Sequence, residues 1–523
     1  MTHKKLNNWL PVLLSFILAL GMVIGYQIAN NVKGNFFKKS TKGSVQEVND
    51  IIKNYYVDSL NVDSLTDETI SDLIQKLDPH SSFIPATLQD DALRDIKGHF
   101  KGLGVAFLQI KDTLHIIQLL KDAPADKAGL MVGDKILMAN QKIFTGVASN
   151  DDSLRKIIKN SPEINLQILR GIETKTYTLK PEMVVMNSID NATMLNEKIG
   201  YIKINTFTER TYEDCMKELE TLLSKKMQHL VIDLRGNGGG LLEEAVDIAD
   251  MLVSGSRTLC TMRGAHIKDQ KYISRRDGIF EDEVKQKIVI LIDEFSASAS
   301  EFLAGSLQDL DRAYIIGTRS YGKGLVMQDY ALSNGSSIRL TVGRYYLPSG
   351  RCIQKPYLLG NKTEYDNELM QRHISGNITD SLLPTTKSFK TLKGNIVYDA
   401  SGITPNLIVK NEYGIGEGIY NKVNINKLAY LYSLKFASTQ LKFTNANTYI
   451  KNYKQNTNDE VWLKNNLAMD SSYSKILPNQ YGLILKDVIL QSTKYTFNKA
   501  GFYSALQFID KPIGAAVNYL MAF

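Results

Sequence analysis

Cysteine is scarce in this chain, and long runs of one charge are missing. The 523 residues contain 3 cysteines, Cys215, Cys260 and Cys352, which lie far apart and form no CxxC pair. This spacing argues against a zinc site and against a disulfide framework. The formal net charge of +7 is modest for this length, so nucleic-acid binding is not indicated. We expect neither a metal nor another cofactor.

Long apolar runs are missing too, except for one near the start. WLPVLLSFILALGMVIGY, Trp9–Tyr26, has 18 residues without a charge, which is short for a membrane span and long for the apolar part of a signal peptide. No clear A-x-A cleavage site follows it. We therefore expect an uncleaved membrane anchor within residues 1–30. More lysines follow this run than precede it, against a simple positive-inside count.

The length of the chain and its changes of pattern predict several domains, because 523 residues are too many for one core. Residues 45–96 have two helical patterns, with Asp67 placed to cap the second. Residues 97–184 have short strands, and residues 185–410 alternate strands with helices, as an α/β core does. Residues 411–523 have helical patterns, and the sequence does not indicate their role.

The strand-rich segment contains two glycine turns in a fixed order. Lys101–Val105 reads KGLGV, and Ala128–Asp134 reads AGLMVGD. Together they resemble the turns of a PDZ domain, whose loop amides bind the terminal carboxylate of an extended peptide. The resemblance implies peptide binding at Gly102, Leu103, Gly104 and Val105.

Three serines two apart, Ser296, Ser298 and Ser300, follow an apolar run. That run, KIVILID at Lys287–Asp293, suits a strand buried on both faces of a sheet, and helical spacing follows the serines. The serines therefore lie on a strand-to-helix turn, beside free helix N–H groups that can stabilise an oxyanion. A serine in this place is either a helix cap or a nucleophile, and the turn alone does not decide which.

A nucleophilic serine needs a base, and none of the 7 histidines lies in a recognisable triad motif. Lys323, in GTRSYGKG, can serve instead if burial lowers its pKa enough to leave it neutral. The segment is close to a P-loop, but Gly324 stands where Ser or Thr is required. Ser320 and Lys323 also have the S-x-x-K form of penicillin-binding enzymes, whose helical turn a glycine loop cannot supply. A lysine presented from a glycine-hinged loop remains, beside the plainer interpretation of a solvated lysine.

Several motifs in one order resemble the carboxy-terminal processing protease family of Ser-Lys peptidases. They are LDPHSSFI, the two PDZ-like turns, DLRGNGGG, SASASEFLAGSLQD, YGKGLV, RYYLPSGRCIQ and SGITPN, between about residues 45 and 410. The resemblance implies an α/β fold with a crotonase-like (ClpP/crotonase-type) protease core at 185–410. It also implies an inserted, mainly-β PDZ domain at 97–184 and a helical N-terminal subdomain at 45–96.

The same resemblance assigns roles to individual residues. They are the nucleophile Ser298, the general base Lys323, and an oxyanion hole from the N–H of Ala299 with that of Gly239 or Gly240. Ser296 and Ser300 are then expected to be cap and packing residues.

Two departures from the family pattern stand in this sequence. The family has a glutamine four residues after the lysine, but here that position is Met327 and Gln328 comes next. Neighbouring strand residues face opposite ways, so either a bulge restores the contact or this chain lacks it. The family's G-I-x-P-D also ends in Asn406, which lies outside the expected site.

The resemblance implies a serine endopeptidase that recognises protein C-termini through its PDZ domain and cleaves near them. Its partners would be protein substrates with accessible C-termini, and an oligomer or an adaptor protein stays open. The alternative is a catalytically impaired PDZ adaptor on the same fold, which Met327 motivates. A crotonase-like acyl-CoA enzyme is a third interpretation, but no feature of the sequence favours a CoA site.

The family's usual location and the apolar run predict an inner-membrane anchor, with the chain from Val45 onward in the periplasm. A topology reporter fused at Phe523 should therefore give an extracytoplasmic signal. A cytoplasmic signal would show that the lysines after the apolar run governed its insertion.

Overall fold

The computed structural model describes most of the chain. Its described residues are 12, 14–24, 26–27, 43–89, 92, 94, 97–146, 151–275, 279–280, 285–374, 387–410, 424–468 and 481–523. They form two compact units, Met1–Leu73 and Ile74–Phe523. Among these residues no helix is long and apolar enough to cross a membrane, and part of the expected anchor at Trp9–Tyr26 lies outside them.

The first unit contains α2 (Ser44–Tyr55) and most of α3 (Val62–Gln75). The side-chain amide of Asn49 in α2 donates to the hydroxyl of Thr66 in α3 over 2.9 Å. The expected cap at Asp67 is wrong, because α3 begins at Val62, five residues earlier. Asn61 takes that place, since its side chain accepts from the N–H of Ser64 over 3.2 Å.

The strand-rich segment forms an antiparallel sheet with the order β3–β4–β5–β7–β8, and β6 pairs with β5. The bounds are β3 Val105–Ile110, β4 Thr113–Leu119, β5 Lys135–Ala139, β6 Lys142–Ile143, β7 Ile164–Arg170 and β8 Glu173–Leu179. The short helix α5 is Pro124–Lys127, and the longer helix α6 is Asp151–Asn160. Leu154 and Ile158 of α6 pack with Phe107 of β3 in one apolar core. The strand before this sheet in the sequence, β2 (His99–Gly102), pairs with the strand after it, β9 (Glu182–Val185).

A mostly parallel sheet forms the centre of the second unit, in the order β10–β11–β12–β15–β16–β21. Only the β10–β11 pair of this sheet, as described, is antiparallel. The bounds are β10 Ile189–Met194, β11 Ile199–Ile204, β12 His229–Asp233, β15 Ile288–Ile292, β16 Ala313–Gly317 and β21 Leu407–Ile408. All residues of β15 are buried, which confirms the prediction of a strand covered on both faces.

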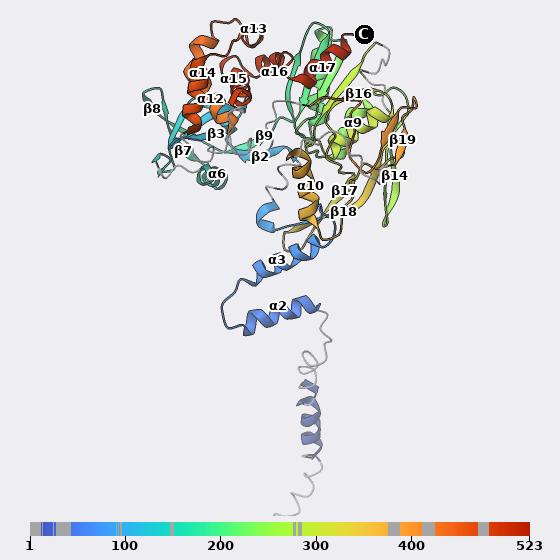
Figure 1. Cartoon of the computed structure of the whole chain (residues 1–523). Helices are drawn as coiled ribbons and strands as arrows, with labels where there is room; N and C mark the ends of the chain where they lie inside the picture. The colour runs from blue at the N-terminus through green and yellow to red at the C-terminus, as the bar shows by residue number, and fades with distance from the viewer. Residues whose placement is uncertain are drawn as a thin grey trace, which may run out of the picture. The chain divides into compact units, whose positions relative to one another are not determined.

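Helices cover both faces of this sheet (Figure 1). On one face lie α7 (Thr211–Ser224), α8 (Leu242–Asp250) and α9 (Ala299–Asp309), packed on alternate strand residues such as Ile232 and Ile290. On the other face, α15 (Tyr481–Thr496), α16 (Lys499–Leu506) and α17 (Lys511–Leu520) pack on Val231 and Val289. Successive strand residues point to opposite faces. The C-terminal helices thus supply the second cover that a buried parallel sheet requires.

A second sheet lies beside the helix α9 and carries several of the family-like motifs. Its order is β1–β18–β13–β14, in which β1 and β13 pair with opposite ends of the long strand β18. The strand β17 also pairs with β18. The bounds are β1 Ser82–Ile84, β13 Thr258–Gly264, β14 Ile267–Ile273, β17 Leu325–Ala331 and β18 Ser337–Tyr346. After it come α10 (Lys362–Ile374) and the hairpin of β19 (Ser388–Lys390) with β20 (Ile396–Tyr398).

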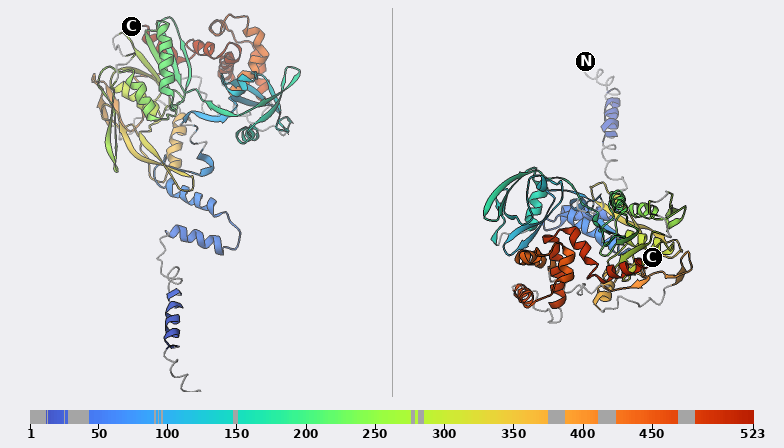
Figure 2. Two further views of the ribbon diagram at one scale, coloured as in Figure 1. Left: turned by 180° about the vertical axis from the view of Figure 1, so that it is seen from behind. Right: turned by 90° about the horizontal axis from the view of Figure 1, so that it is seen from above.

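The remaining C-terminal helices are α12 (Ile425–Gln440), α13 (Ala446–Asn452) and α14 (Thr457–Ala468). The helix α12 packs along α15 and lies beside the strand-rich segment in both views of Figure 2. There the hydroxyl of Tyr430 lies 3.5 Å from Nδ1 of His115 in β4. The C-terminal helices therefore contact the strand-rich segment as well as the central sheet.

Candidate active site

The three serines lie on a turn between β15 and α9, as predicted, and Ser298 is the N-cap of α9. Its backbone has φ 56° and ψ −115°, a conformation that is strained for any residue with a side chain. A strained serine on a strand-to-helix turn is the arrangement that exposes a nucleophile at the end of a sheet.

Ser296 and Ser300 are completely buried, as expected of packing residues, and their hydroxyls bond to another loop. The Oγ of Ser296 donates to the carbonyl of Leu234 and the Oγ of Ser300 to the carbonyl of Asn237, each over 2.9 Å. The N–H of Ala297 also donates to the carbonyl of Asn237, over 3.0 Å. The expected capping role is wrong, because Ser298 is the N-cap of α9. Both hydroxyls instead bind the serine turn (residues 293–300) to the glycine loop that follows β12 (residues 234–241).

That loop brings Gly239 directly against the serine turn. A Cβ on Gly239, whose φ is +103°, would lie 2.8 Å from Cβ of Ser298 and 3.0 Å from the backbone nitrogen of Ala299. A Cβ on Gly240 would lie 2.1 Å from the carbonyl oxygen of Phe207. Only glycine fits at both positions, since no backbone atom can move aside that far.

The amides of this region differ in whether they are already bonded. The N–H of Gly239 donates to Oδ1 of Asn237 over 2.8 Å. The N–H groups of Gly240 and Ala299 donate to no acceptor within the described part of the chain. Of the two glycines predicted for an oxyanion hole, Gly240 is thus the one whose donor is available.

Glu301 joins the serine turn to the lysine loop. Its Oε2 accepts from the N–H of Ser298 over 2.9 Å and from the N–H of Lys323 over 2.8 Å. Its Oε1 accepts from the N–H of Gly322 over 2.6 Å and from the hydroxyl of Ser320 over 2.5 Å. Burial raises the pKa of Glu301 above its usual value, although these donors oppose the shift.

A phenol makes a second link between the same two segments. The hydroxyl of Tyr345, in β18, lies 3.2 Å from the carbonyl of Ser298 and 3.0 Å from that of Lys323. Sequence reasoning assigned no role to Glu301 or Tyr345. A signal for Glu301 was present, because a glutamate three residues after an N-cap serine forms a capping box.

Lys323 lies in the loop between β16 and β17, and its side chain is largely buried. Burial lowers the pKa of its ammonium group, and the charges of Arg339 and Lys362 lower it further. The negative charges of Glu301 and Asp78 oppose this shift. The direction is the one that a lysine needs in order to act as a base near neutral pH.

The LDPHSSFI segment lies next to this lysine. Asp78 accepts from the N–H groups of His80 and Ser81, over 2.9 and 3.0 Å, and from the hydroxyl of Thr341 in β18 over 2.9 Å. Burial, aided by the charge of Lys323, lowers the pKa of His80 to about 3. Its Nε2 lies 3.0 Å from the hydroxyl of Tyr365. His80 is therefore a neutral, hydrogen-bonded neighbour of the lysine loop.

The bulge considered for the missing glutamine is present, but its extra residue is on the partner strand. The register of β17 with β18 shifts between Val326 and Met327, and Val342 of β18 is the residue left over. Gln328 is exposed and accepts from the hydroxyl of Tyr330 over 3.2 Å. Among the described residues no hydrogen bond joins Gln328 to Lys323.

The predicted peptide-binding loop lies between β2 and β3. Leu103 is only 2% exposed, and its side chain belongs to the apolar core of the strand-rich segment. Gly104 has φ +73°, and a Cβ there would lie 2.2 Å from Cβ of Ala123. Neither Leu103 nor Gly104 uses its N–H in a hydrogen bond to another described residue. These two amides are thus free to bind a carboxylate, and Gly102 and Val105 flank them.

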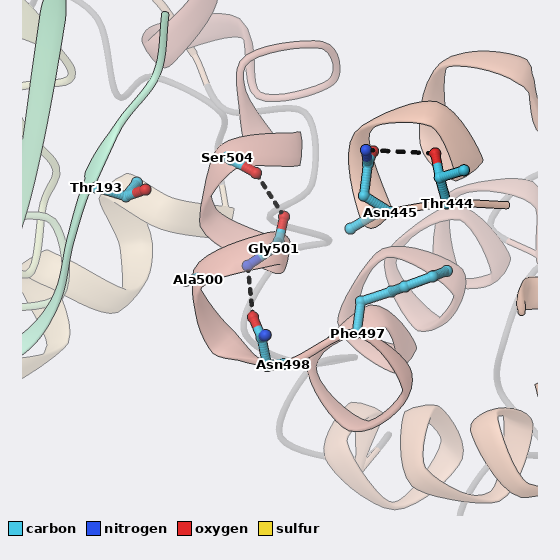
Figure 3. A pocket seen from close by; sticks show the side chains of 9 residues that line it. Thr193, Thr444, Asn445, Phe497, Asn498, Ala500, Gly501 and Ser504 are labelled. Atoms are coloured by element: carbon cyan, nitrogen blue, oxygen red, sulfur yellow. Dashed lines mark hydrogen bonds between the residues drawn. The ribbon is translucent and has the colours of Figure 1, made fainter.

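One hollow of the described surface is lined by none of the residues described so far in this site. It measures about 400 Å³ and lies between β10, α13 and α16 (Figure 3). Its lining residues are Thr193, Thr444, Asn445, Ala446, Phe497, Asn498, Ala500, Gly501 and Ser504. No residue of the serine turn, the glycine loop or the lysine loop lines it, so we do not assign the reaction to it.

The sequence matches the model of peptidase family S41 over residues 198–368 and that of a PDZ domain over residues 102–180. It is 32% identical over 345 residues to a carboxy-terminal-processing protease of Bartonella bacilliformis, covering 65% of this chain and 78% of that protein. The chain belongs to this family of carboxy-terminal processing proteases. The predicted family and its PDZ domain are thereby confirmed.

One further relative and one solved structure are also similar to this chain. A protein of Staphylococcus aureus named a probable CtpA-like serine protease is 27% identical over 394 residues, which is 74% of this chain and 77% of that protein. The structure of a photosystem II D1 C-terminal processing protease is 21% identical, with a TM-score of 0.37, and the match covers 70% of this chain and 92% of that one.

The links through Glu301 lead to a prediction about stability. Glu301→Gln places an NH₂ group where a carboxylate oxygen now accepts two hydrogen bonds, so two buried donors lose their acceptor. The variant should lower the free energy of unfolding by about 2 to 4 kcal/mol, measured by urea denaturation. Glu244→Gln is the control, because an amide oxygen can still accept from the N–H of Tyr212. Equal losses in the two variants would contradict this role of Glu301.

Proposed function

We propose that this chain is a serine endopeptidase with a Ser298–Lys323 dyad, built on a crotonase-like core with a helical N-terminal subdomain. The observation that carries the proposal is the pair of links through Glu301 and Tyr345, each of which contacts the backbone of both residues. Family membership supports a protease, and the lowered pKa of Lys323 supports its role as base.

In the proposed reaction, neutral Lys323 accepts the proton of the Ser298 hydroxyl while Oγ attacks the carbonyl carbon of the scissile bond. The N–H groups of Ala299 and Gly240 stabilise the resulting oxyanion. The intermediate then expels the amine, which takes its proton from the lysine, and an acyl-enzyme remains. Water activated by the same lysine releases the acid and returns Ser298 to its starting state.

We propose further that the PDZ domain selects the substrate by its C-terminus. The free amides of Leu103 and Gly104 can hold a carboxylate. An extended chain can add to β3, which pairs with β4 alone among the described strands of its sheet. The substrates are then proteins with an unstructured, accessible C-terminal tail.

The cell envelope is the proposed location, with an inner-membrane anchor in residues 1–30 and the catalytic part in the periplasm. The apolar run and the family's usual location support it. The reporter fused at Phe523 decides this point.

A catalytically impaired PDZ adaptor is the second candidate. The exposed position of Gln328 favours it, because the lysine then lacks the glutamine that usually orients it. Binding of a tailed protein without cleavage by the wild-type chain would support the adaptor.

The dyad predicts a particular pH dependence. The folded-state pKa of Lys323 lies below the value of about 10.4 for a free lysine. Peptidase activity should therefore rise with pH through that lowered pKa. Between the two pKa values the unfolded chain binds the extra proton, so the free energy of unfolding should also rise with pH. Lys323→Met should remove this contribution to the stability slope.

Ser298→Ala, Lys323→Ala and Lys323→Arg should all lose activity by comparable factors, because the pair acts as a unit and a guanidinium cannot serve as the base. His80→Gln is the control for a histidine mechanism. It should keep the rise of activity with pH, because His80 titrates near pH 3. Near-normal activity of Lys323→Ala, together with an inactive His80→Gln, would require a histidine base instead.

The PDZ proposal is tested with an unstructured protein that ends in an apolar tail, offered with a free or an amidated C-terminus. The free tail should be cleaved about tenfold more efficiently or better, since one charge-assisted contact is worth about 1.5 to 3 kcal/mol. Binding of both forms to Ser298→Ala separates recognition from turnover. Equal cleavage of both tails would show that the carboxylate is not recognised.

A further inference from the structure

The glycine loop has a second support besides the serine turn, on the side of the C-terminal helices. Arg235 immediately precedes the loop, and its NH1 donates to both carboxylate oxygens of Asp510 over 3.0 and 2.9 Å. Its Nε and NH2 donate to Asp233 at the end of β12. The side chains of Arg235 and Asp510 are 12% and 7% exposed, so water competes little for this ion pair.

Asp510 is itself firmly held, because it is the N-cap of α17 and accepts from the N–H of Ile513 over 2.9 Å. Ile513, Ala516 and Leu520 of α17 are fully buried against the central sheet. The carboxylate that receives Arg235 thus stands on a helix that cannot shift without opening an apolar core.

The glycine loop is also bound by the serine turn. The N–H of Gly236 donates to Oδ1 of Asp293 over 2.9 Å, and the carbonyl of Asn237 accepts from Ser300. The start of the loop is therefore bound by the serine turn and by the N-terminus of α17. Its end is bound by Phe207, whose N–H donates to the carbonyl of Gly239 over 3.0 Å and whose carbonyl accepts from the N–H of Leu241 over 2.8 Å. An oxyanion donor must be held within a fraction of an ångström, so the contacts at the start of the loop also affect the position of Gly240.

We infer that Asp510 is a positioning residue for catalysis, holding the glycine loop and its Gly240 amide in place through Arg235. The C-terminal helices are then part of the catalytic apparatus. This inference rests on the proposed function for its kinetic consequence, but the restraint on the loop can be measured without turnover.

A second ion pair offers a matched control. Asp190 in β10 accepts from Nζ of Lys499 over 2.6 Å and from the hydroxyl of Tyr503, so it also joins the C-terminal helices to the central sheet. β10 is an edge strand of the described sheet. Asp190 also accepts from the side-chain amide of Asn205 over 2.9 Å, a bond that the amide oxygen of Asp190→Asn can keep. Asp510→Asn and Asp190→Asn each remove one carboxylate from the same interface. Asparagine also keeps the N-cap of α17, since it caps helices as well as aspartate does.

The experiment compares the full-length wild-type chain with these two variants by steady-state kinetics on the tailed substrate and by hydrogen exchange. Asp510→Asn should lower kcat by about ten- to a hundredfold with KM changed less than about twofold, because a displaced oxyanion donor acts on the transition state. The Gly236 and Gly239 amides should exchange about tenfold faster or more, as expected for a freed loop. Asp190→Asn should leave kcat within about twofold and the exchange of these amides unchanged.

The outcomes separate this inference from the proposed function. If the wild type cleaves nothing while Asp510→Asn accelerates exchange in the loop, the restraint stands and the peptidase assignment fails. If the wild type cleaves and both variants lose the same kcat, Asp510 serves only the interface and the inference is wrong. Unchanged exchange of the loop amides in Asp510→Asn would also overturn it.

Discussion

The arrangement of the site depends on one buried carboxylate. Glu301 accepts hydrogen bonds from Ser298, Lys323 and their neighbours, and a carboxylate is the side chain that can accept several at once without offering a donor. Burial makes such a group costly unless every lone pair is used. The fold meets that condition because donors from both the serine turn and the lysine loop bond to the two carboxylate oxygens of Glu301.

The central sheet explains why these segments can meet at all. The turn after β15 and the loop after β16 leave the carboxyl ends of adjacent parallel strands, so both emerge at the same edge. The glycine loop leaves β12, the neighbour of β15 on the other side. These three segments, which are separate in the sequence, are thus neighbours because their strands are neighbours.

The C-terminal helices contact three other parts of the second unit. They cover the second face of the central sheet, contact the strand-rich segment through Tyr430, and reach the glycine loop through Asp510. A parallel sheet exposed on one face would not be stable in water. The same helices that cover that face also reach the glycine loop, through the ion pair of Asp510 with Arg235.

The sequence by itself determined the order of the elements, the buried strand β15, the serine turn and the family, because apolar periodicity and motif spacing are local properties. It also placed Lys323 on a glycine loop before a strand. It could not determine the work of Ser296 and Ser300, the choice between Gly239 and Gly240, or the link from Asp510 to Arg235. The hydrogen-bond partners of Ser296, Ser300 and Asp510 lie 62, 63 and 275 positions away in the sequence, and no local pattern places such atoms within about 3 Å of one another. Only tertiary packing decides such distances.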